Sequence, residues 1–145
     1  MNDEQSLEGM VVLISPKLLN DPARQRGAVG TVVQAVPAQD DFVVRFKGGV
    51  SGLYSSGALL VLKSHEQIYK DVLNSTKELM PFELKALMRM TMLLQSGSKE
   101  QMIEAMEIAG LNAELLKRST EPLSSRIGIS AQYQQEANVS LSRSR

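Results

Sequence analysis

The sequence predicts an α+β protein, in which a small β-barrel comes first and helices follow. Two observations predict this class. Short runs rich in β-branched residues, separated by glycine-containing turns, occupy residues 9–62. From Ser64 onward, apolar residues recur instead at helical spacing. We therefore divide the chain into a barrel over residues 1–63, a helical segment of three to four helices over residues 64–125, and a flexible tail over residues 126–145.

Five strands are expected in the first unit. They cover residues 9–14, 27–36, 42–46, 50–54 and 59–62. Gly48 and Gly49 favour a hairpin turn between the third and fourth strands, because glycine adopts a positive φ without steric cost. Gly30 is interpreted as the point where the backbone turns before the second strand alternates.

Capping signals place the helix starts. Ser64 and Gln67 have the spacing of a capping box, in which the serine oxygen accepts from a first-turn backbone N–H. Ser98 and Gln101 repeat this spacing. Pro81 suits the first position of a helix, where its missing N–H is not needed. These signals predict three helices beginning near residues 65, 81 and 99.

The helical segment also carries signals for where regular structure ends. Gly97 and Gly110 are expected to end the second and third helices. Asn112 is suited to capping a last short helix over residues 113–118. Pro122 is expected to stop regular structure. The chain from about Arg126 is polar and is expected to be mobile, with docking of Ile127, Ile129 and Tyr133 on a neighbouring surface as the alternative.

The composition limits the classes of function. The chain has no cysteine, which excludes disulfides, thiolate nucleophiles and zinc fingers. Its N-terminus is acidic and polar, and no apolar run approaches the length of a membrane span, so a cytoplasmic protein without a membrane partner is expected. The formal net charge is zero, which disfavours nucleic acid as the partner, since phosphate binding usually requires a basic excess.

One part of the chain resembles a known family. The residues that carry the resemblance are Gly9, Val12, Ile14, Gly27, Gly30, Val32 and Val36, with the loop of residues 16–26 between them. Residues 9–62 thereby resemble an SH3-like barrel of the KOW type, which is found in ribosomal and transcription-elongation proteins. The resemblance implies a small barrel and a nucleic-acid-associated role. A Tudor-like barrel is a poorer match, because an aromatic cage would have only Phe42, Phe46 and Tyr54.

The loop of residues 16–26 is the main candidate binding segment, because long loops in compact domains are often binding loops. It combines cations with two leucines. The candidate partner-binding residues are Lys17, Leu18, Leu19, Arg24 and Arg26 of the loop, with Arg45, Lys47 and Tyr54 of the following strands. The alternative is a solvated connection whose leucines close one end of the barrel.

Catalysis and metal binding have little support in the sequence. No phosphate-cradling glycine loop and no nucleophile or zinc-protease motif is present. The single histidine, His65, falls at a helix start, and Asp40 and Asp41 fit a turn between strands. We therefore predict no catalytic residue, no metal and no cofactor, and a chain that is not an enzyme.

The helical segment leaves two further interpretations open. Six of the eight methionines lie there, namely Met80, Met88, Met90, Met92, Met102 and Met106. They fit a core, with a self-association surface as the alternative. Residues 105–116 have the order helix, glycine turn, helix, so a DNA-binding helix-turn-helix is considered, although Glu100, Glu104 and Glu107 precede it and would repel phosphate.

These observations lead to a non-catalytic binding or adaptor protein that uses its barrel as a protein-interaction module. The partner is expected to be a protein. Two alternatives remain at this point: a KOW-like nucleic-acid-associated factor, and a structural subunit that assembles through its methionine-rich helices, including as a homo-oligomer.

Overall fold

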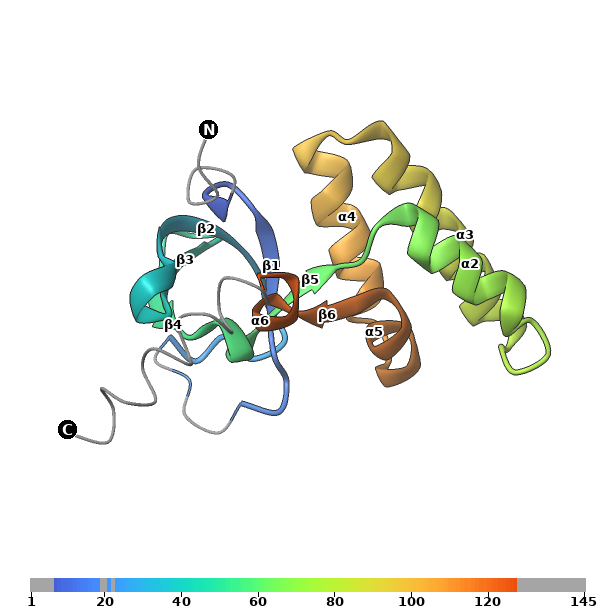
Figure 1. Ribbon diagram of the computed structural model, residues 1–145, viewed down its shortest axis with the longest axis horizontal. Coiled ribbons are helices and arrows are strands. Elements are labelled where there is room, and N and C mark those ends of the chain that lie inside the picture. Colours follow the sequence, from blue (N-terminus) through green and yellow to red (C-terminus); the bar gives the residue numbers. More distant parts are fainter. Residues whose placement is uncertain (1–6, 19–20, 22, 128–145) are drawn as a thin grey trace.

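A computed structural model describes residues 7–18, 21 and 23–127 of the 145-residue chain. The α+β class is confirmed, since five strands precede a group of helices and a sixth strand, which follows four of these helices, completes one antiparallel sheet (Figure 1). The strands are β1 (Val11–Ile14), β2 (Val29–Val36), β3 (Asp41–Phe46), β4 (Ser51–Tyr54), β5 (Leu59–Leu62) and β6 (Thr120–Pro122). The helices are α2 (His65–Asn74), α3 (Pro81–Ser96), α4 (Lys99–Ala109), α5 (Ala113–Ser119) and α6 (Leu123–Arg126). Short 3-10 helices cover Pro37–Gln39 and Ser56–Ala58.

The strand order is β4-β3-β2-β1-β5-β6, and every pair is antiparallel. β1 pairs with β2 on one side and with β5 on the other, so the last strand of the first unit returns to its first strand. All five strands predicted for this unit are present, shortened by one or two residues at some ends. The turn between β3 and β4 has Gly48 and Gly49 at φ of 102° and 95°, as the sequence predicted.

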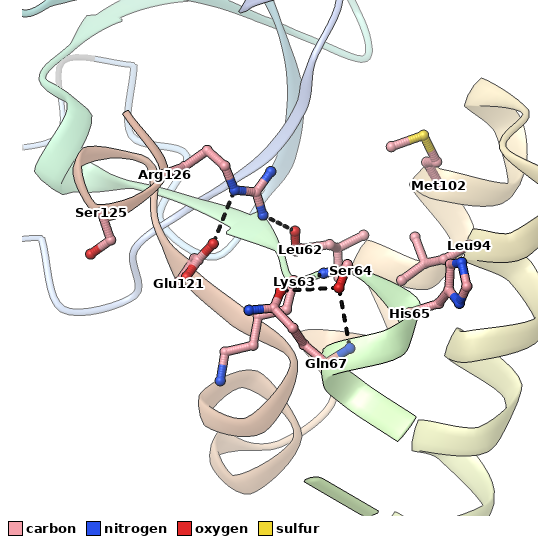
Figure 2. Close-up of a pocket in the computed structure, with 10 residues that line it drawn as sticks. All are labelled: Leu62, Lys63, Ser64, His65, Gln67, Leu94, Met102, Glu121, Ser125 and Arg126. Atoms are coloured by element: carbon pink, nitrogen blue, oxygen red, sulfur yellow. Dashed lines mark hydrogen bonds and ion pairs between the residues drawn. The ribbon is translucent and has the colours of Figure 1, made fainter. Parts of the chain in front are cut away.

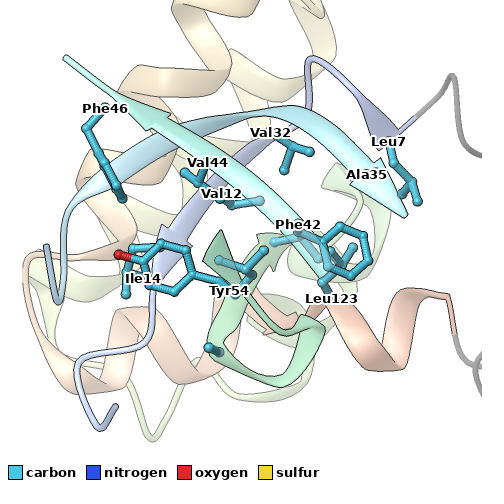
Figure 3. Packing of buried hydrophobic residues seen from close by; sticks show 13 residues of the cluster. Leu7, Val12, Ile14, Val32, Ala35, Phe42, Val44, Phe46, Tyr54 and Leu123 are labelled. Atoms are coloured by element: carbon cyan, nitrogen blue, oxygen red, sulfur yellow. The ribbon is translucent and has the colours of Figure 1, made fainter. Parts of the chain in front are cut away.

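β1 is buried on both faces, and so is most of β5. Val12 and Ile14 pack into the barrel core with Phe42, whereas Val11 and Leu13 pack against the helices. Figure 3 shows the barrel core, with Val12 and Ile14 lying among aromatic and branched side chains. Strands buried on both faces have continuous apolar sequences, which explains the runs Val-Val-Leu-Ile and Leu-Leu-Val-Leu. The barrel and the helices therefore share these strands as a common wall.

The second core is helical. Its largest fully buried side chains from the helices are Ile68 of α2, Leu87 and Met90 of α3, Met106 of α4 and Leu115 of α5. α4 lies against β1 (Figure 1), and Leu13 reaches the turn at its end, where a Cβ on Gly110 would lie 3.3 Å from Leu13 Cδ1. Two of the six helical methionines are thus fully buried, as a core interpretation requires, while Met80 and Met92 are exposed.

The predicted caps are largely confirmed. Ser64 and Gln67 form a complete capping box, and Asn112 accepts from the Leu115 N–H at 2.7 Å. Gly97 has the left-handed conformation, with φ of 76°. Ser98 accepts from the Gln101 N–H at 3.2 Å, so the hydrogen bond to the serine side chain that belongs to the predicted capping box is present.

Two expectations are corrected by the structure. Gly30 lies inside β2 and makes no turn. It is required for close packing, because a Cβ there would lie 2.5 Å from Val44 Cγ1 and 3.0 Å from the Phe46 ring. Pro122 does not stop regular structure: it ends β6 at the sheet edge and serves as the N-cap of α6. An edge strand tolerates proline, because a backbone N–H at an outward-facing position would donate to no neighbouring strand, so its absence costs no hydrogen bond in the sheet.

β6 and α6 bring the chain back to the barrel after the helices (Figure 1). β6 pairs with β5, and Leu123 of α6 is fully buried in the barrel core. The tail expected from residue 126 therefore begins with two residues that belong to this returning segment, Arg126 at the end of α6 and Ile127 packed against the core. Residues 128–145 lie outside the described residues, as does Leu19. No helix among the described residues is long and apolar enough to cross a membrane.

The shared wall predicts that the barrel and the helices unfold together. We expect Leu13→Ala to lower the free energy of unfolding by about 2–5 kcal/mol, because Leu13 is 1% exposed and its loss leaves a cavity between β1 and the helices. Urea unfolding followed by circular dichroism measures this. The matched control is Leu53→Ala, which removes the same atoms from a side chain that is 54% exposed and should change the value by less than about 0.5 kcal/mol. Loss of helical signal well before loss of the strands would contradict a shared wall.

Candidate functional site

The loop of residues 16–26, called the basic loop below, is anchored on the barrel by Asp21. Its carboxylate accepts a hydrogen bond from the Tyr54 hydroxyl at 2.5 Å. It also accepts from the backbone N–H groups of Ala23, at 3.1 Å, and Gln25, at 2.6 Å. One side chain thus shapes the returning half of the loop and ties it to β4.

The electrostatics of this anchor follow from its burial and its hydrogen bonds. Burial by itself would raise the pKa of Asp21, but the hydrogen bonds from Tyr54, Gln25 and Ala23 together lower it below its ordinary value. Burial raises the pKa of Tyr54 well above its ordinary value, and its hydrogen bond to the ionised Asp21 raises it further. At physiological pH, Asp21 is therefore an ionised carboxylate and Tyr54 is a neutral phenol.

The ends of the basic loop lie side by side. Gly27 donates its N–H to the Ile14 carbonyl at 2.8 Å, and Ile14 donates to the Ala28 carbonyl at 3.0 Å. The loop thus leaves and re-enters the sheet at one place, so Arg26 returns beside Ser15, which lies two residues before Lys17. The side chains of Arg26 and Lys17 are exposed.

The structure separates the predicted site residues into three groups. The cations Lys17, Arg24 and Arg26 are exposed on the basic loop. Arg45 and Lys47 are exposed too, but Arg45 alternates with the buried Val44 and Phe46 and so projects from the outer face of β3. The sequence pattern grouped these cations, whereas the sheet directs Arg45 away from the face that anchors the loop.

The third group lies beneath the loop. Tyr54 is 3% exposed and packs edge-on against Phe46, with ring centroids 6.2 Å apart. Leu18 is partly buried against the barrel core. Tyr54 presents no free surface and supports the loop from below. Leu18 joins the loop to the barrel core by this packing, in the direction of the alternative in which the loop leucines close the barrel.

A groove runs from the basic loop to α5. Its volume is about 620 Å³, and its lining is mostly apolar. Leu60 of β5 and Leu116 of α5 contribute the apolar surface, while Lys17 and Lys117 come from opposite walls. Lys117 was not among the predicted site residues, because only the tertiary structure brings α5 beside residues 15–17.

A second pocket, of about 490 Å³, opens where β5, α2 and α6 meet (Figure 2). Arg126 donates from Nε to Glu121 at 3.0 Å and from Nη2 to the Leu62 carbonyl at 2.5 Å. His65, the single histidine, also lines this pocket. The arginine is already engaged, so the polar groups here fasten α6 and β6 to β5.

Arg118 of α5 is bound to three carboxylates from the helical segment. Arg118 pairs with Glu114 at 2.6 Å, with Asp71 at 3.0 Å and with Glu78 at 3.1 Å. The hydrogen bond to Glu114, aided by those to Asp71 and Glu78, raises the pKa of Arg118 above its ordinary value although burial acts to lower it. A helix-turn-helix would need this arginine for DNA, and its side chain is only 14% exposed.

Asp40, which was predicted with Asp41 to lie in a turn between strands, has a structural role there. Asp40 adopts a left-handed conformation after the 3-10 helix and accepts from the Ser56 N–H at 3.0 Å. Within the described part of the chain, no three histidine, aspartate or glutamate side chains are close enough together to hold a metal ion.

Comparisons with models of protein families, with curated proteins and with solved structures found no match to this chain.

The anchor gives a pH-dependent prediction. We expect Tyr54→Phe to lower the free energy of unfolding at pH 7 by about 1 kcal/mol, since it removes a hydrogen bond to a charged group near solvent. The folded-state pKa of Asp21 lies below its ordinary value of 3.8. Its contribution is therefore present above that pH and is lost as the pH falls through the folded-state pKa.

The difference between wild type and Tyr54→Phe should accordingly shrink below about pH 3.8. Urea unfolding at a series of pH values measures it. Tyr69→Phe is the control, because it deletes the same hydroxyl from a side chain that is 45% exposed. If the difference in free energy of unfolding stayed constant below pH 3.8, the stabilising effect of the Tyr54 hydroxyl would not depend on ionised Asp21.

Proposed function

We propose that this protein is a non-catalytic adaptor whose SH3-like barrel binds an acidic segment of a protein partner through the basic loop. The observation that carries the proposal is the anchoring of the loop by Asp21 and Tyr54. These bonds hold the part of the loop that carries Arg24 and Arg26, so this part loses less entropy when it binds and more of the contact energy appears as affinity.

The charges near the loop support an acidic partner. No ion pair among the described residues includes Lys17, Arg24 or Arg26. The nearest acid in sequence, Asp21, directs its carboxylate toward Tyr54 and the loop backbone. The loop therefore presents cations outward and its carboxylate inward.

Two features favour a protein partner over a nucleic acid. The chain has no net positive charge, whereas phosphate binding draws its affinity from a basic excess. Arg45 projects from the outer face of β3, while the loop is held from the inner side by Tyr54. The cations thus do not form the continuous track that a phosphate backbone follows.

Fluorescence anisotropy tests the proposal. A labelled glutamate-rich peptide, a single-stranded RNA and a duplex DNA are titrated at low and moderate salt. We expect the peptide to bind, and Arg24→Ala/Arg26→Ala to weaken binding by about threefold to tenfold, as the loss of exposed charge pairs implies. Lys85→Ala/Lys99→Ala removes the same charge from exposed positions on the helices and should have no effect.

The outcomes separate the candidates. No peptide binding at low salt would overturn the proposal. RNA or DNA binding that is tighter than peptide binding, and that weakens in the loop variant, would replace it with the KOW-like nucleic-acid role.

A second candidate function, a structural subunit, is supported by exposed apolar side chains on the helices. Tyr69 and Leu73 of α2 are 45% and 56% exposed, and Phe82 and Met92 of α3 are 55% and 67% exposed. Exposed apolar side chains on neighbouring helices are a common feature of self-association surfaces.

Sedimentation velocity over a wide concentration range tests this candidate. Self-association through α2 and α3 predicts a concentration-dependent dimer that is lost in Met92→Lys and kept in the control Gln39→Lys, which adds the same charge at an exposed position of the first 3-10 helix. A monomer at every concentration would rule the candidate out.

A further inference from the structure

We propose that the acidic segment bound by the basic loop is amphipathic, and that its apolar side chains enter the groove between the barrel and α5 while its carboxylates meet Lys17 and Lys117. This inference rests on the proposed function and specifies the partner that it requires.

The groove has an apolar base and cationic walls. Leu60 and Leu116 are only partly covered and supply apolar surface. Pro16 and Pro122 add apolar surface from the loop and from the end of β6. A volume of about 620 Å³ accommodates two or three aliphatic side chains and removes part of their surface from water.

The net charge of the groove walls is positive. Lys17 and Lys117 are exposed, and neither forms an ion pair among the described residues. One carboxylate, Glu121, also lines the groove, but it pairs with Arg126 at 3.0 Å. A segment that carries glutamates beside leucines matches this distribution, whereas a basic segment would be repelled.

The groove is continuous with the basic loop. Ser15, Pro16 and Lys17 form its first wall, and Ser15 is held to the sheet by its N–H bond to the Ala58 carbonyl at 2.9 Å. Arg26 returns beside Ser15 through the Gly27 to Ile14 hydrogen bond. One extended or helical segment can thus contact Arg26, Lys17 and the groove in succession.

Only the assembled molecule contains this surface. One wall belongs to the barrel and the other to α5, and β6 lies between them. The helical segment therefore has a binding role in this proposal, in addition to covering β1.

The experiment uses the full chain and two labelled peptides, one of leucine and glutamate at helical spacing, the other with serine in place of leucine. We expect the leucine peptide to bind more tightly, by about tenfold, because each buried aliphatic side chain adds to affinity. Lys17→Ala/Lys117→Ala should weaken its binding by about threefold to tenfold. The control is again Lys85→Ala/Lys99→Ala.

A second variant tests the groove itself. Ala113→Glu places a carboxylate in the groove at the first position of α5, where an acidic residue suits the helix N-terminus and is expected to be compatible with folding. We expect it to weaken binding of the leucine peptide. The control Ala38→Glu makes the same charge change at an exposed position of the first 3-10 helix. Thermal melting confirms that both variants fold.

The outcomes distinguish this inference from the proposed function. If Arg24→Ala/Arg26→Ala weakens binding, but the groove variants do not and the two peptides bind equally, the inference is overturned and the adaptor function stands. If no variant of either kind changes binding, both are overturned. If the groove variants and the leucines both matter, the inference is supported.

Discussion

The burial of β1 on both faces is the constraint on which the rest of the structure depends. Val12 and Ile14 complete the barrel core, and Val11 and Leu13 complete the helical core. Each core is small for a chain of this length, and neither closes without this strand. The chain therefore gains stability by sharing one wall between two cores, which makes the barrel and the helices interdependent.

The same arrangement creates the surfaces that the proposals use. Because the helices pack on β1 and β5, α5 comes beside the start of the basic loop, and β6 returns to pair with β5. The groove is the space left where these elements meet. Across β6 from it, Arg126 ties α6 to Glu121 and to the Leu62 carbonyl, so the returning segment is fixed. Position, rather than any unusual residue, places Lys17 and Lys117 on the same groove.

Sequence patterns were most reliable where the signal is local. The five strands, the Gly48 and Gly49 turn, and the caps at Ser64 and Asn112 each depend on neighbouring residues. Sequence patterns failed where an element depends on residues that are distant in the sequence. Gly30 is required by Val44 and Phe46 on the next strand, and β6 is too short to show a period of two. For the candidate site, the loop and its cations were predicted, but the anchor Asp21 was not, although an aspartate placed two and four residues before free N–H groups is a signal for such a turn.

The sequence by itself determined the class of the fold, the positions of most elements and the absence of thiol chemistry, because these follow from spacing and composition. Only the tertiary structure decided which cations share a surface, why Tyr54 is buried and where α5 lies relative to the loop. The physical reason is that alternation along a strand fixes which side chains lie inward, but not which distant element packs on each face. Val11 and Leu13 pack against the helices, with α4 in contact with β1, and this packing determines which face of the sheet the helices cover. It thereby also determines where the groove forms.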